Sequence, residues 1–195
     1  MMKWHKILFF IGMTIIFIGC DTEDITYPKP LSGMKISFQE KDFSNQIQGC
    51  NFEFLSPTYA VIDSATQGCN LNINYIPFDA TLFLTYIPVD TGGLMNHLEY
   101  SRKLVYEHSI QADGIEEKTI VNPAHHVYGT AYKLIGNSAS NYQFYLTDSL
   151  NHFLRGALYF NAKPNYDSLK PSIDYLMVDF DTLFNSLEWS TITEE

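Results

Sequence analysis

Cys20 is the residue of this chain whose surroundings predict a specific chemical modification. It follows an apolar stretch at residues 7–18, which Lys3 and Lys6 precede, and a small residue stands directly before it. A positive start, an apolar core and a small residue at the cleavage point are typical of a secretory signal peptide. A cysteine directly after that point takes diacylglycerol on its thiol, and the new amine is acylated after cleavage. We therefore predict a lipoprotein signal peptide at residues 1–19 and lipidation of Cys20.

An ordinary transmembrane anchor is the alternative for this segment. The apolar run is about a dozen residues long, whereas a spanning helix needs about 20. Phe17 stands where a lipobox usually has leucine, but it keeps the position bulky and apolar. The length of the run favours the lipid anchor over a spanning helix.

Cys50 and Cys69 are the two remaining cysteines. An exported chain enters an oxidising compartment, where an even number of cysteines predicts a disulfide. This bond would close a loop of about 20 residues and contribute roughly 3 kcal/mol. A shared metal ion is a poorer explanation, because the chain has no CxxC motif and no histidine close to either cysteine. Two buried free thiols are the other alternative. We predict a disulfide and no metal site.

A serine, a histidine and an aspartate in one turn invite a search for hydrolase chemistry. Asp148, Ser149 and His152 crowd one predicted hairpin turn. A catalytic triad depends on spatial geometry, with the acid orienting the histidine and the histidine touching the serine. A polar turn uses the same residue types to hydrogen-bond its own backbone, and no GxSxG motif is present. We therefore predict no catalytic residues.

Three further segments resemble functional sites only superficially. His125 and His126 are adjacent, and neighbours in an extended segment point to opposite faces, so we expect a solvated loop pair rather than a chelate. His108 lies on the apolar side of a predicted helix and is expected to be a packing residue. The loop at residues 136–140 lacks both the GxGxxG spacing and a Walker lysine. We predict no cofactor.

The charge balance excludes two classes of partner. The chain has 12 Lys and Arg residues against 22 Asp and Glu residues, which gives a net charge of −10. Binding of nucleic acid needs a basic patch, and docking on anionic lipid needs basic residues as well. The lipid must therefore hold the protein at the membrane without help from charge, as several acyl chains can.

The organisation of the chain predicts one folded domain behind a tether. Residues 20–33 are polar and contain Pro28 and Pro30, which stiffen an extended segment. Residues 34–195 are long enough for a single domain with a sizeable core. We expect strands near residues 35–39, 51–55, 59–62, 70–75, 81–87, 118–121, 127–135, 142–146 and 153–160.

Two amphipathic helices complete the predicted fold. The first runs from about Leu94 to Ala112 and stops at an Asp-Gly pair. The second runs from about Ser168 to Trp189, with Asp167 or Ser168 as its cap. Short turns between strands favour an antiparallel sheet, so the order predicts an α+β domain with two helices covering a mainly antiparallel sheet. The buried stripe of the second helix is Ile173, Leu176, Phe180, Leu183 and Leu187, widened by Met177 and Phe184.

Many of these segments together resemble the gliding-motility lipoprotein GldD family, in an order and spacing that are specific although each piece alone is weak. The resemblance covers most of the chain after Cys20. The segments are Cys50–Phe54, Cys69–Ile73, Ala80–Tyr86, Leu104–His108, Ala112–Asp113, Val127–Gly129, Gly136–Ser140, Gln143–Ser149, His152–Phe153, Gly156–Phe160, Ala162–Ser168 and Ser186–Trp189. His125 and His126 depart from the family pattern.

The resemblance implies a membrane-anchored lipoprotein facing the periplasm, with a part in bacterial gliding and a link to type IX secretion. It implies no enzymatic activity, and its expected partners are other gliding and secretion proteins of the cell envelope. The order of elements also resembles the Mog1/PsbP-type α/β/α sandwich, which is a fold analogy only. The alternative function is a periplasmic ligand-binding module of PsbP type, with Tyr128, Tyr132 or Tyr145 lining its pocket.

Overall fold

The computed structural model describes residues 38, 40–45, 47, 49–63, 69–90 and 93–190. The predicted signal peptide, the lipidation site Cys20 and the tether lie outside these residues. Most of the strand predicted at 35–39 also lies outside them.

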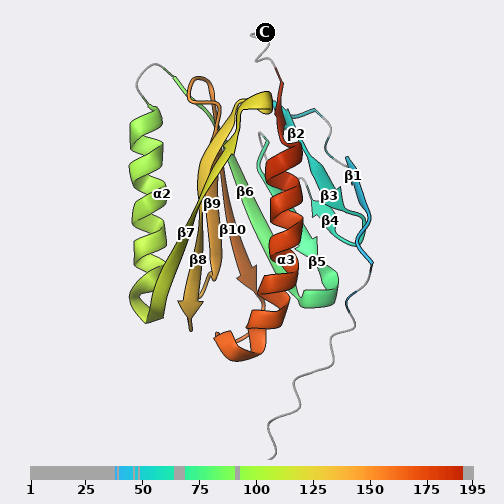
Figure 1. The fold of residues 1–195 in the computed structure, drawn as a ribbon, viewed down its shortest axis with the longest axis vertical. Coiled ribbons are helices and arrows are strands. Elements are labelled where there is room, and N and C mark those ends of the chain that lie inside the picture. The colour runs from blue at the N-terminus through green and yellow to red at the C-terminus, as the bar shows by residue number, and fades with distance from the viewer. Residues whose placement is uncertain are drawn as a thin grey trace, which may run out of the picture. The chain divides into compact units, whose positions relative to one another are not determined.

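A seven-stranded sheet forms the centre of the described part, in the order β4-β5-β6-β10-β9-β8-β7 (Figure 1). Every neighbouring pair is antiparallel. With its two described helices, the structure confirms the predicted α+β class. The strands are β4 (Val61–Asp63), β5 (Leu71–Tyr75), β6 (Ala80–Pro88), β7 (Ala112–Asn122), β8 (Val127–Gly136), β9 (Tyr142–Thr147) and β10 (His152–Phe160).

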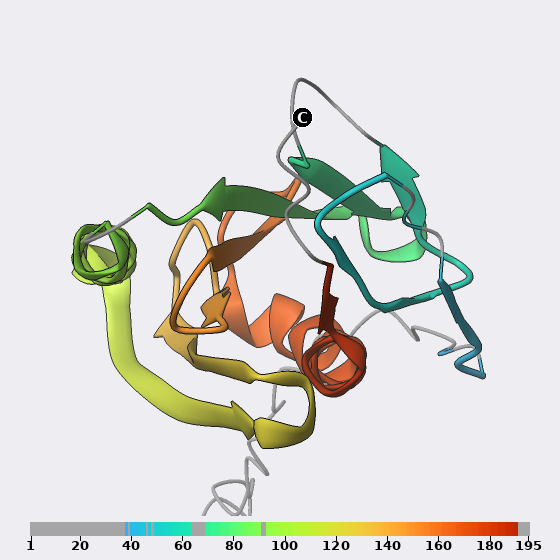
Figure 2. The ribbon, with the colours of Figure 1, turned by 90° about the horizontal axis from the view of Figure 1, so that it is seen from above.

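The larger core lies between the sheet and α3 (Tyr166–Ser186). Successive side chains of a strand point to opposite faces, and on this face Ile73, Leu82 and Leu154 are almost fully buried. Figure 2 shows the sheet curving around α3. All five residues of the predicted helix stripe are buried to 2% exposure or less. Each buried Leu, Ile or Phe side chain contributes about 1.5–3 kcal/mol, so this face supplies most of the apolar burial.

The start of α3 lies slightly before the predicted position. The cap is Asn165, whose side chain accepts a hydrogen bond from the backbone N–H of Ser168, rather than Asp167 or Ser168 themselves. This earlier start places Pro171 beyond the first turn, where its missing N–H leaves one helical carbonyl without its usual donor.

The opposite face of the sheet carries α2 (Leu94–His108), so the described part has three layers (Figure 2). Val105 packs there on Tyr132 and Leu134 in a second, smaller core. The prediction extended this helix to Ala112, which is wrong: a short 3₁₀ turn at Ser109–Gln111 follows α2, and β7 starts at Ala112.

The Asp-Gly pair that was expected to stop the helix instead forms an irregular start of β7. The register with β8 shifts between Ala112 and Gly114. Opposite this shift Gly136 has a φ of 112°, and a Cβ there would lie 2.8 Å from the backbone nitrogen of Asp113. The close approach of two backbones therefore requires glycine at this position.

Two short ribbons pack beside the main sheet. β1 (Phe43–Asn45), which the sequence did not predict, pairs with β3 (Leu55–Pro57). β2 (Phe52–Glu53) pairs with β11 (Glu188–Trp189). The second helix was expected to reach Trp189, but it ends at Ser186, because Leu187 adopts an extended conformation.

A disulfide joins Cys50 to Cys69, with Cα atoms 5.3 Å apart. Cys50 lies just before β2, and Cys69 lies just before β5 of the main sheet. The bond therefore fastens the ribbon of β2 and β11 to the sheet.

Lysines from three other segments hold α3 in place. Lys41 lies 2.6 Å from the buried carboxylate of Asp179, and Tyr59 donates a hydrogen bond to the same carboxylate. Burial raises the pKa of Asp179, while the contacts with Lys41 and Tyr59 act in the opposite sense. Two further ion pairs involve aspartates of the same helix that are more exposed than Asp179. They are Lys118–Asp181 at 2.6 Å and Lys133–Asp174 at 2.7 Å.

Candidate functional site

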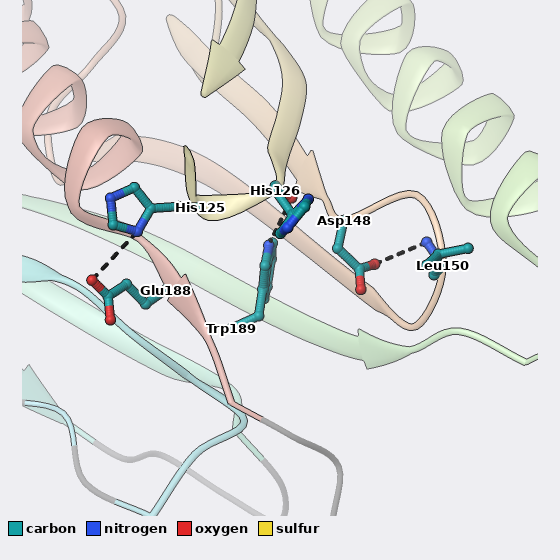
Figure 3. A pocket seen from close by; sticks show the side chains of 6 residues that line it. All are labelled: His125, His126, Asp148, Leu150, Glu188 and Trp189. Atoms are coloured by element: carbon teal, nitrogen blue, oxygen red, sulfur yellow. Dashed lines mark hydrogen bonds and ion pairs between the residues drawn. The ribbon is translucent and has the colours of Figure 1, made fainter. Parts of the chain in front are cut away.

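Three segments that are distant in the sequence meet at one end of the sheet. They are the β7–β8 turn, the β9–β10 turn and β11, and they enclose a pocket of about 450 Å³ (Figure 3). This volume lies within the range of about 300–1,000 Å³ typical of small-molecule sites. The lining residues are His125, His126, Asp148, Leu150, Glu188 and Trp189.

Asp148 organises the β9–β10 turn. Its Oδ1 accepts hydrogen bonds from the backbone N–H groups of Leu150, Asn151 and His152, at 2.8–2.9 Å. Ser149 adopts a positive φ of 71°, and its N–H donates to the side chain of Thr147. This arrangement is the backbone-binding role that the sequence predicted for the turn, and it leaves the second oxygen of Asp148, Oδ2, outside these turn hydrogen bonds.

The three residues of the suspected triad are not arranged as a triad in the structure. Asp148 Oδ2 lies 4.0 Å from His152 Nε2, which is too long for a hydrogen bond. In the described part of the chain, no hydrogen bond joins Ser149 to His152. His152 is 5% exposed, and its Nδ1 lies 2.8 Å from the hydroxyl of Tyr86.

The environment of His152 favours the neutral imidazole. Burial lowers its pKa, and the nearby Asp148 only partly offsets this. Asn51 donates a hydrogen bond to the hydroxyl of Tyr86 at 3.3 Å, so that hydroxyl is free to donate its own proton to Nδ1 of His152. The remaining proton then resides on Nε2, which has no acceptor within hydrogen-bond distance among the described residues.

Trp189 covers His152. The two rings are stacked with centroids 5.0 Å apart and planes inclined by 12°. The indole N–H donates to the backbone oxygen of His126 at 3.2 Å. One face of the indole is thus occupied by imidazole, and its edge is tied to the β7–β8 turn.

The adjacent histidines take different positions in the pocket wall. Residues 123–125 form a 3₁₀ turn rather than an extended segment, and His126 follows with a φ of 52°. Nδ1 of His125 lies 3.3 Å from Glu188, whereas His126 contributes its backbone oxygen to Trp189 (Figure 3). The pair was expected to be a solvated loop without a role, and the structure instead places both residues in the lining.

The position of Trp189 is fixed from behind by the disulfide-linked segment. The backbone N–H of Ser190 donates to the oxygen of Asn51 at 2.9 Å. Asn51 follows Cys50 directly, and its side chain reaches Tyr86. Sequence reasoning missed Trp189 as a site residue because it assigned Trp189 to the end of the preceding helix, whose apolar stripe continues through Leu187.

The other candidates of the sequence analysis lie outside this pocket. His108 contacts the backbone oxygen of Leu104 through Nδ1 and the hydroxyl of Tyr159 through Nε2, at 2.7 and 3.1 Å. It is the satisfied packing residue that was expected. Tyr132 and Tyr145 belong to the small core under α2. Tyr132 is 3% exposed, and neither tyrosine, nor Tyr128, lines the pocket.

The loop at residues 136–140 is structural as well. Ser138 donates to the backbone oxygens of His108 and Ser140, and Asn141 donates to those of Leu134 and Gly136. These bonds satisfy backbone carbonyls in and around the loop. Among the described residues, no cluster of three or more His, Cys, Asp and Glu side chains is placed to hold a metal ion.

The fold and the site together define an α+β protein with an open pocket of mixed acidic, aromatic and imidazole character at one end of its sheet. The sequence model of the family described as gliding motility lipoprotein GldD matches residues 23–189. The chain belongs to this family, and it is therefore a membrane-anchored lipoprotein of the cell envelope. No individual curated protein matches it significantly. No helix within the described ranges is long and apolar enough to cross a membrane.

Proposed function

We propose that this protein is a lipid-anchored, non-enzymatic component of the gliding machinery, linked to type IX secretion, that faces the periplasm and works by contacting other envelope proteins. The observation that carries the proposal is the family match over residues 23–189. The signal segment and Cys20 supply the anchor, since lipidation there leaves the folded part outside the cytoplasm.

The geometry around His152 supports a non-enzymatic role. A general base needs a hydrogen-bonded acid or an accessible nitrogen close to its substrate. His152 is buried, its Nδ1 contacts Tyr86, and Asp148 is engaged by three backbone donors. Asp148 and His152 therefore act together as turn and packing residues.

Gene deletion tests the first part of the proposal. We expect colony spreading and type IX secretion to stop in the deletion strain and to return with the wild-type gene. A Cys20→Ala gene is expected to give an unacylated protein that starts at Met1, as measured by mass analysis of the envelope, and to leave spreading unrestored. Normal spreading after deletion would refute the proposal.

His152→Phe tests the non-enzymatic part. Phenylalanine keeps an aromatic ring against Trp189 but removes all acid–base capacity. General acid–base catalysis typically supplies ~10²–10⁴ in rate, so an enzyme that relied on His152 would be nearly inactive. We expect normal spreading at wild-type abundance, and loss of spreading in a stably folded His152→Phe protein would contradict this.

A ligand-binding module is the second candidate, and the volume of the pocket favours it. The tyrosines proposed for that role do not contribute, so a ligand would rest on the six lining residues alone. Native mass spectrometry of protein extracted from its own envelope separates the two functions. A stoichiometric small molecule that is lost in a Trp189→Ala variant would favour ligand binding over a protein contact.

A further inference from the structure

We infer that the pocket at the end of the sheet receives a basic side chain, Lys or Arg, from a partner protein. A basic side chain specifies the chemistry of the contact in the proposed function. The inference rests on the proposed function in one respect, namely that the occupant belongs to a protein. The charges of the lining, the place of Trp189 in the pocket wall and the exposure of the rim support this assignment.

The lining carries two carboxylates, and Nδ1 of the lining residue His125 lies 3.3 Å from one of them, that of Glu188. Asp148 and Glu188 contribute carboxylates, and no lysine or arginine of the described part of the chain lines the pocket. Oδ1 of Asp148 is engaged by the turn, but among the described residues Oδ2 has no hydrogen-bond or ion-pair partner closer than His152 at 4.0 Å. Burial lowers the pKa of His152, which disfavours a positive charge on its ring. The whole chain is acidic at −10, so a cationic partner is attracted from a distance as well.

Trp189 suits the same occupant. His152 covers one face of the indole and the indole N–H is bonded to His126, while Trp189 still lines the pocket. A guanidinium or ammonium group within about 6 Å of an indole centroid is attracted by the ring, and tryptophan is the strongest such partner. The aliphatic stem of Lys or Arg can lie along apolar surface while its charged end reaches a carboxylate.

The rim indicates that the cation arrives on a macromolecule. The side chain of Glu188 is 56% exposed, and Leu150 is 72% exposed at the pocket edge. Small-molecule sites usually bury about 70–90% of their ligand, whereas Glu188 and Leu150 are exposed at the edge of this pocket. A partner whose own surface covers Leu150 would complete the enclosure.

Fluorescence of Trp189 gives a site-specific test. The chain has two tryptophans, and Trp4 lies in the predicted signal peptide, so the lipidated protein that starts at Cys20, extracted in detergent micelles, reports on Trp189 alone. The probes are the peptides acetyl-Gly-Arg-Gly-amide and acetyl-Gly-citrulline-Gly-amide, which differ in charge but hardly in shape. We expect a saturable change with the arginine peptide and an affinity about tenfold lower for the citrulline peptide. Raising the salt concentration should weaken the binding of the arginine peptide and leave that of the citrulline peptide unchanged.

Charge-neutral variants locate the contact. Asp148→Asn keeps an oxygen that can accept from the three backbone N–H groups of the turn. It should lower the affinity for the arginine peptide about tenfold. Glu188 lies at the exposed rim, so Glu188→Gln should lower the affinity for the arginine peptide about two- to fivefold. Glu99→Gln, on the exposed side of α2, is the matched control and should change nothing. Far-UV circular dichroism checks folding, and Glu188→Gln keeps the test valid if Asp148→Asn fails to fold.

The outcomes separate this inference from the proposed function. Equal affinity for both peptides, no saturation with either, or full binding in both acidic-residue variants would overturn the inference. If the arginine peptide does not bind but gene deletion still stops spreading, the proposed function stands and the inference falls. If the arginine peptide binds and the deletion strain spreads normally, the proposed function falls and the basic-side-chain site stands.

Discussion

Trp189 and His152 are stacked face to face although 37 positions separate them in the chain, with ring centroids 5.0 Å apart and planes inclined by 12°. One residue belongs to the two-residue strand β11 and the other starts the long strand β10. The stack therefore ties the last described strand to the main sheet and shapes one wall of the pocket.

Loss of the indole should destabilise this end of the protein. Trp189→Ala removes the stack on His152 and the hydrogen bond to His126, and we expect the free energy of unfolding to fall by about 2–3 kcal/mol. Urea denaturation followed by circular dichroism measures the change. Tyr106→Ala, at a ring that is 51% exposed on α2, is the control and should cost about 0.5 kcal/mol or less. Equal losses would mean that the stack contributes nothing specific.

The disulfide should stabilise both the fold and the pocket. Replacing Cys50 and Cys69 together by serine removes a cross-link that encloses a loop of about 20 residues, and we expect a loss of about 3 kcal/mol. Because Asn51, next to Cys50, accepts the N–H of Ser190, the emission of Trp189 should also shift toward that of a more exposed indole. A reductant should reproduce both effects in the wild type and have none in the double variant. Two freely alkylated thiols in the native wild type would contradict the bond itself.

His152 should make stability depend on pH. Its pKa is lowered in the folded state, first by burial, so the unfolded chain takes up the proton at a higher pH than the folded chain does. The unfolded state then binds more protons, and stability rises with pH in this range. The contribution is fully present above about pH 6.5 and is lost as the pH falls toward the lowered value.

His152→Phe isolates this contribution, since the other histidines remain in both proteins. We expect the urea midpoint of the wild type to fall more between pH 7.5 and pH 5 than that of the variant. An identical fall in both would show that His152 titrates equally in the folded and unfolded states.

The long elements of the fold could be predicted from periodicity. β5, β6, β8, β9 and β10 carry alternating or continuous apolar residues, and both described helices begin close to the expected positions. The predicted stripe of α3 is the buried stripe. These features are local, because each depends on the spacing of side chains along one element.

The pocket could not be predicted, because no local pattern encodes it. His125, Asp148 and Trp189 come together only through the order of the strands. Trp189 also follows Leu187, whose spacing continues the helical stripe, and nothing in the sequence marks the change of Leu187 to an extended backbone. The early end of α2 was missed for a related reason, since Asp113-Gly114 is a common helix stop that here starts a strand.

Two aspartates of α3 allow a matched test of burial in ion pairing. Asp179 and Asp181 each lie 2.6 Å from a lysine, but the side chain of Asp179 is fully buried whereas that of Asp181 is 45% exposed. Asp179→Asn leaves Lys41 without its charged partner and weakens the hydrogen bond from Tyr59. Removing one partner of a buried pair costs about 3–5 kcal/mol, and we expect about 3 kcal/mol here.

Asp181→Asn should cost less than about 1 kcal/mol, because the exposed pair with Lys118 is screened by solvent. Urea denaturation at low and high salt measures both variants on one helix. Added salt should reduce the small effect of Asp181→Asn and leave the large effect of Asp179→Asn nearly unchanged. If the two variants lost the same stability, the buried pair would not be what holds α3 against Lys41, and the apolar stripe alone would account for its position.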